Sequence, residues 1–292
     1  MIINQANLSG VYRSFSTIFN KEFEAAKSQW PLVAMSVPST ARTNDYKWLG
    51  NFPAMKEWVG DRVIKDLSAF HYEIENKDFE STIEIDRNNI EDDQIGLYTP
   101  MIQGLAQAAK QHPDVLVFTA MKEGFSQICY DGQYFFDTDH PVGGASVSNF
   151  GGGSGTGWYL MDVSRPIKPM ILQIRKKPKP VALDKPTDDH VFMRRKYRYG
   201  VEDRKNVGFG LWQLIYASKD TLNNTNYAAA KAAMMGFTND DGVPLGIRAT
   251  HLVVSPVLEE AGRNLLLVDR LASGAGNPWF KSAELVVVPW LA

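Results

Sequence analysis

The sequence predicts an α+β fold, a globular chain that contains both helices and strands. Apolar residues recur at spacings of three and four near the N-terminus, which predicts an amphipathic helix over residues 4–27. The last quarter predicts a helix over about 226–236, a strand over 250–254, a helix over 256–268 and a strand over 284–290. An apolar content of 44% and a charged content of 22% are ordinary for a soluble protein.

Residues 70–86 alternate between apolar and acidic side chains. Ile74 and Ile85 mark two short strands, and the polar segment 76–78 between them favours a turn. We therefore expect an antiparallel hairpin with one acidic face. Residues 73–93 hold nine acidic residues against two basic ones.

A long helix is predicted over residues 90–111. Pro100 should break it near Tyr98, because proline lacks the backbone N–H that a helix interior requires. Pro113 should end it for the same reason, and a second helix should follow over about 114–122.

Residues 173–205 have the opposite character, with eleven basic residues against five acidic ones. Alternating apolar positions predict strand within this stretch, namely Val191, Met193, Tyr197 and Tyr199. The acidic hairpin and the basic stretch could each be a solvated face. Their opposite charges also suit a contact across a subunit boundary, where complementarity fixes orientation and register.

The chain lacks the usual sequence motifs of an enzyme. The glycine run at 151–157 has neither the following helix of a dinucleotide site nor the Lys-Ser or Lys-Thr of a phosphate loop, so we expect a surface loop. Cys129 is the single cysteine, which excludes an intrachain disulfide, and we expect it to be buried. Ser255-Pro256 predicts helix capping rather than a nucleophile. These features favour a scaffold that binds copies of itself and uses no cofactor.

One compact group of acids and imidazole remains, formed by Asp137, Asp139 and His140. Two carboxylates and a histidine could hold a divalent metal, as in a small hydrolase. The same residues precede a proline, and aspartates in such positions commonly bond local backbone N–H groups in turns. We favour the turn.

The order of these segments resembles the major capsid protein fold of tailed bacteriophages, and more narrowly the major head subunit (gpT) of Mu-like phages and prophages. The matching strings are NKDFESTIEIDRNNIEDDQIGLY, CYDGQYFFDTDHPV, RYGVEDRKNVGFGLWQLIYASKDTL and ATHLVVSPVLEEAGRNLL. They follow the family's order over most of the chain.

The resemblance implies four parts: an N-terminal arm (1–37), an extended loop (38–86), a peripheral domain with a long spine helix (87–112 and 186–219) and an axial domain (113–185 and 220–292). It implies self-assembly into hexamers and pentamers of an icosahedral shell that encloses double-stranded DNA. The shell would form in the host bacterial cytoplasm and become the virion capsid. An encapsulin-like shell around a protein cargo shares the fold and is the alternative.

The resemblance also implies partners. These are other copies of the chain, a separate scaffold protein because no long charged helical segment precedes the arm, a portal, a decoration protein, and DNA. The net charge of −2 indicates weak, non-specific contact with DNA, and no segment predicts membrane insertion. The extended loop would lie over a neighbouring subunit. We therefore expect contacts between one group of acids and one group of bases in adjacent copies: Glu73, Glu75, Glu80 or Glu84 against Arg194, Arg195, Lys196 or Arg198.

Overall fold

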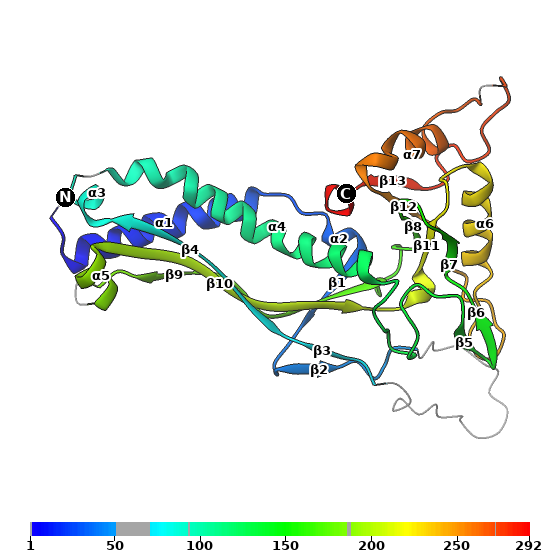
Figure 1. The fold of residues 1–292 in the computed structure, drawn as a ribbon, viewed down its shortest axis with the longest axis horizontal. Coiled ribbons are helices and arrows are strands. Elements are labelled where there is room, and N and C mark those ends of the chain that lie inside the picture. Colours follow the sequence, from blue (N-terminus) through cyan, green and yellow to red (C-terminus); the bar gives the residue numbers. More distant parts are fainter. Residues whose placement is uncertain (1, 51–70, 93, 186–187, 272) are drawn as a thin grey trace.

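The computed structural model describes residues 2–50, 71–92, 94–185, 188–271 and 273–292. Within this part, the molecule is elongated, with a narrow end that holds the N-terminus and a wide end that holds the C-terminus (Figure 1). Two hydrophobic cores fill it, a smaller one at the narrow end and a larger one that extends through the wide end. None of the described helices is long and apolar enough to span a bilayer.

Helix α1 (Gln5–Ala25) confirms the predicted N-terminal helix. The side chain of Asn4 accepts a hydrogen bond from the Asn7 N–H and so caps the first turn. The buried stripe of α1 contains Leu8, Val11, Phe15 and Phe19, which face α4 and the sheet beneath it. The short helix α2 (Trp30–Val33) follows.

Helix α4 (Thr99–Glu123) forms the spine of the molecule. It is preceded by α3 (Arg87–Glu91) and a 3₁₀ turn η1 (Gln94–Tyr98), so the predicted break near Tyr98 is confirmed. The predicted end at Pro113 was wrong, because α4 continues through it. Proline costs the helix a hydrogen bond. The next turns are nevertheless anchored, since Asp114 bonds the N–H groups of Gln29 and Trp30, and Phe118 lies in the core.

A four-stranded sheet supports the two long helices, in the order β1-β9-β10-β4. Its strands are β1 (Ala34–Pro38), β9 (Met170–Leu183), β10 (Lys196–Phe209) and β4 (Lys77–Asp86). Strands β9 and β10 are antiparallel, and together they connect the wide end to the narrow end (Figure 1). Their register shifts between Glu202 and Lys205, which lies between the two cores.

The predicted hairpin over residues 70–86 was wrong. Strand β3 (Glu73–Glu75) pairs with β2 (Thr43–Asp45), whereas β4 pairs with β10. Asn76 does not turn the chain, because its amide donates to Ser39 Oγ and the Ala41 carbonyl and holds the segment extended. Residues 51–70 of the expected extended loop lie outside the described residues.

Helix α5 (Asp189–Arg194) also corrects an expectation. It holds Val191 and Met193, which the alternation had assigned to a strand, and the strand begins at Lys196. Arg195 ends α5 in the left-handed conformation, with φ of 56°.

The wide end contains a five-stranded sheet in the order β13-β12-β8-β11-β7. Its strands are β13 (Glu284–Val287), β12 (His251–Val254), β8 (Trp158–Met161), β11 (Ile215–Lys219) and β7 (Phe150–Gly153). Helices α6 (Asn224–Met235) and α7 (Glu259–Leu266) lie beside it (Figure 1). The 3₁₀ turns η2 (Trp212–Leu214), η3 (Pro256–Leu258) and η4 (Pro289–Leu291) and the hairpin β5 (His140–Val142) and β6 (Ala145–Val147) complete it.

Two further expectations fail in the wide end. Part of the glycine run belongs to β7, and Gly153 approaches the chain at Asp220 so closely that a Cβ would lie 2.2 Å from its nitrogen. Ser255 occupies the N-cap position of η3, but its side chain makes no capping bond.

Candidate functional site

The acidic and basic residues singled out in the sequence meet along the β4–β10 pair. Glu84 lies opposite Arg198, and its carboxylate accepts hydrogen bonds from Lys196 Nζ at 2.9 Å and Arg198 Nε at 2.9 Å. These two donors, Lys196 first, lower the pKa of Glu84 to about 2. Both partners belong to the same chain, which the sequence did not reveal.

The other acids of the predicted set have different surroundings. Glu75 pairs with Arg42 at 2.7 Å, and Glu73 is exposed. Glu80 accepts a hydrogen bond from Thr82 and lies opposite Glu202, a like charge.

Arg194 and Arg195 are exposed at the end of α5, and neither forms an ion pair within the part of the chain that the structure covers. A single chain therefore brings together Glu84, Lys196 and Arg198. A contact of the remaining residues with an adjacent copy stays a prediction.

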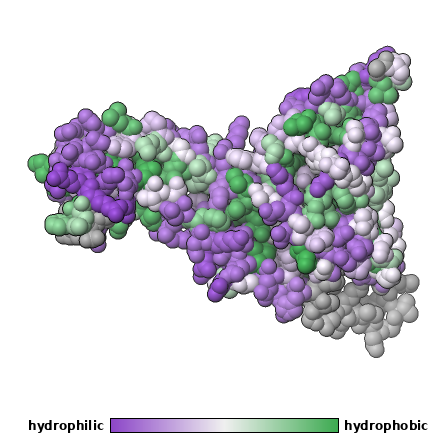
Figure 2. Space-filling view, viewed as in Figure 1, coloured by the Kyte–Doolittle hydropathy of each residue, from purple (hydrophilic) through white to green (hydrophobic). Residues whose placement is uncertain are grey.

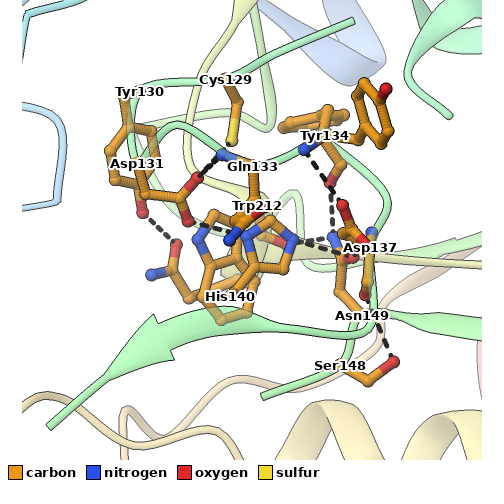
Figure 3. Close-up of polar contacts among 12 residues, drawn as sticks. Cys129, Tyr130, Asp131, Gln133, Tyr134, Asp137, His140, Ser148, Asn149 and Trp212 are labelled. Atoms are coloured by element: carbon orange, nitrogen blue, oxygen red, sulfur yellow. Dashed lines mark hydrogen bonds and ion pairs between the residues drawn. The ribbon is translucent and has the colours of Figure 1, made fainter. Parts of the chain in front are cut away.

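The second cluster is centred on His140, whose side chain is fully buried. Its Nδ1 lies 2.7 Å from Asp131 Oδ2 and its Nε2 lies 3.2 Å from Asn149 Oδ1 (Figure 3). Asn149 donates its amide to the Phe135 carbonyl, so its oxygen must face the ring. The two ring nitrogens therefore face two oxygen atoms, one from the Asp131 carboxylate and one from the Asn149 amide.

Further contacts surround the buried ring. The indole of Trp212 is stacked on the imidazole, with ring centroids 4.0 Å apart. Burial raises the pKa of Asp131, but the hydrogen bonds from His140 and Cys129 outweigh burial, and the pKa is lowered. Loop 129–137, strand β5, the residue before β7 and the turn η2 are joined at this point.

The three residues weighed as metal ligands have separate roles. Asp137 accepts from the N–H groups of Tyr134 and Thr138, which is the local turn that we favoured, and Asp139 is exposed. No sequence pattern pointed to Asp131, which is nine residues before His140.

Cys129, Asp131 and His140 offer ligand atoms within 4.8 Å of one another. Each of these atoms already has a protein partner, and burial raises the pKa of the Cys129 thiol, which disfavours the thiolate that binds metals. The cluster is suited to joining backbone segments rather than to hydrolysis.

Comparison with known proteins decides the family. The family model described as the Mu-like prophage major head subunit gpT matches residues 8–291. The chain belongs to this family. The major capsid protein of Escherichia phage Mu is 40% identical to it over the full length of both chains. The Mu-like prophage FluMu major head subunit of Haemophilus influenzae is 42% identical, with 89% of this chain and 88% of the relative covered.

Solved structures agree with this Mu-like head subunit in fold. The chain in the procapsid of bacteriophage JBD30 has a TM-score of 0.88 and 43% identity, with 99% of this chain and all of that chain covered. The chain in the JBD30 capsid has a TM-score of 0.80 and 33% identity over both full lengths. The fold is thus the tailed-phage major capsid fold. The protein is a structural component of the virion capsid, where it assembles with copies of itself, and it is not an enzyme.

Proposed function

We propose that the chain forms hexamers and pentamers of an icosahedral head that encloses double-stranded DNA. The full-length match to the JBD30 procapsid chain is the observation that carries the proposal. In this arrangement the narrow end is the peripheral domain with α4 as its spine, and the wide end is the axial domain. A scaffold protein and a portal act as separate partners in assembly.

A decoration protein is a further proposed partner. One JBD30 capsid is decorated with minor capsid protein trimers, and its chain has a TM-score of 0.79 and 34% identity to this one, with 91% of this chain and 92% of that chain covered. Packaged DNA is bound weakly and non-specifically, in keeping with the net charge of −2.

Electron microscopy and mass measurement of the expressed protein test the shell. Closed particles of megadalton mass support the proposal, and a small oligomer under all assembly conditions contradicts it. Nuclease-protected DNA in particles from induced cells supports a phage head, whereas a protein cargo supports the encapsulin alternative.

The charged contact between copies is proposed for the residues that the single chain leaves apart. Glu80 and Glu73 then approach Arg194 or Arg195 of an adjacent copy. The double reversal Arg194→Glu and Arg195→Glu should reduce assembly more at low salt than at high salt, because screening weakens exposed charge pairs. The matched control is Lys177→Glu with Lys179→Glu, which makes the same change of charge on β9. Equal assembly of both variants contradicts the contact.

A further inference from the structure

The narrow end has a groove that the described residues do not fill. The groove is about 420 Å³ in volume and lies between α1 and the η1–α4 segment, above β10. Small residues form much of its wall, and one aromatic residue of β10 also lines it: Ala6, Gly10, Ser14, Gly96, Thr99 and Tyr199.

Two glycines in this wall have open space beside them among the described residues. A Cβ built on Gly10 or Gly96 would meet no atom within 4 Å. Neither residue has the positive φ that would demand glycine. Glycine inside a helix is destabilising relative to alanine, so Gly10 costs α1 stability without a packing benefit in the single chain.

Tyr199 of β10 lines the groove and is fully buried. Its ring is stacked on that of Phe15 of α1, with centroids 5.5 Å apart. The groove therefore has an aromatic, apolar wall, which suits an apolar occupant.

A large apolar projection is exposed at the same end of the molecule. Phe192 and Met193 on α5 are 82% and 70% exposed. Figure 1 places α5 near the start of α1 and near α3, and Figure 2 shows a largely hydrophilic surface around this end. An aromatic side chain exposed to this degree is typical of an interface.

The charges around the projection and the groove are complementary. Arg194 and Arg195 follow the apolar pair on α5, whereas Asp86 follows the groove residue Ile85 and Asp92 precedes η1. Copies of this chain meet in a shell, so a projection and a groove at one end can join head to tail and close a ring about a symmetry axis.

We infer that α5 of one copy inserts Phe192 and Met193 into the groove between α1 and α4 of an adjacent copy. The two arginines then face the acidic residues beside the groove. This contact is heterologous, because the two surfaces differ. The inference rests on the proposed shell, and its test is made on shells that have already formed.

Crosslinking between two cysteine variants tests the contact. One chain carries Gly10→Cys, the other carries Phe192→Cys, and both carry Cys129→Ala. Shells co-assembled from the two chains and oxidised should yield a disulfide-linked dimer on a non-reducing gel. The control replaces Gly10→Cys with Gly104→Cys, which lies on the exposed face of α4 outside the groove and likewise has open space around its Cβ. Equal yields from the two pairs would overturn the contact while leaving the shell intact.

A larger side chain in the groove tests the contact without crosslinking. Gly10→Leu should lower the yield of shells about tenfold relative to Gly104→Leu, because overpacking an interface has that order of effect. Gly10→Ala should leave the unassembled subunit folded and slightly more resistant to urea. Native shell yield from Gly10→Leu would overturn the inference. A failure of the native chain to form shells would instead refute the proposed function.

Discussion

Glu84 and Arg198 face each other across the β4–β10 pair, with Arg198 Nη2 2.8 Å from Glu84 Oε1. The contact joins the end of the expected extended loop to β10 of the same chain. The sequence suggested that Glu84 and Arg198 would meet across a subunit boundary. In the structure they instead pair two strands of one subunit and favour the observed register.

This pair predicts a pH-dependent stability. The pKa of Glu84 is lowered from 4.5 to about 2, so its contribution is present above the unfolded value and is lost as the pH falls from about 4.5 to about 2. Urea unfolding of the unassembled subunit should show Glu84→Gln less stable than the native chain at pH 6 and equal to it near pH 2. Glu73→Gln, at an exposed carboxylate, is the control and should track the native chain at both values. A Glu84→Gln deficit that persists at the lower pH would count against the ion pair.

The buried His140 cluster predicts a large loss of stability when the imidazole is removed. His140→Phe keeps an aromatic ring against Trp212 but leaves the buried carboxylate of Asp131 without its strongest donor. We expect a loss of about 3 kcal/mol in the free energy of unfolding. His71→Phe, at a 71% exposed side chain, should change it by less than about 0.5 kcal/mol. Similar losses in the free energy of unfolding for the two variants would show that the His140 cluster does not stabilise the fold.

Two substitutions of Asp114 should differ in their effect on stability. It accepts hydrogen bonds from the Gln29 and Trp30 N–H groups at 2.8 and 2.6 Å, and burial raises its pKa. Asn retains an acceptor oxygen, so Asp114→Asn should be tolerated. Asp114→Ala loses both bonds and should cost about 2 kcal/mol. A raised pKa means that this site favours folding below the folded-state pKa. Asp114→Asn should accordingly gain stability relative to the native chain as the pH rises. Thermal unfolding at two pH values checks both points.

The thiol of Cys129 should react slowly with thiol reagents in the folded subunit. Burial is the main cause that raises the pKa of its thiol, and the Asp131 carboxylate adds to it. A thiol reagent at pH 8 should label the folded subunit far more slowly than the urea-unfolded chain, because the thiolate is the reactive form. Labelling of the native protein at the unfolded rate would contradict the described burial.

Elements with a strong local signal were predictable from the sequence. The spacing of Leu8, Val11 and Phe15 gave α1, and Pro100 marked the start of α4. Strand partners were not predictable, because alternation shows that residues 77–86 form a strand but not that β10 receives it. Pro113 misled for a related reason, since tertiary anchoring of the following turns outweighs a local penalty.

The His140 site shows the same division. The sequence pointed to His140 itself, and local turn chemistry correctly accounted for Asp137. Asp131 and Trp212 could not be found, because their proximity to His140 depends on how the loop and η2 fold against each other. Residues that meet in this way have no regular spacing in the sequence.

The register shift between Glu202 and Lys205 has a consequence for the geometry of the head. Extra residues in one strand bend and twist a sheet locally, and this bend lies between the two cores. A closed surface with both five- and six-membered rings requires one chain to accept unequal curvature. We expect the narrow end to tilt at this point while each core stays rigid. Subunits from the two kinds of ring, superposed on the wide end, should then diverge in the narrow end, on the Glu202 side of the shift. A uniform difference along the whole chain would disprove the hinge.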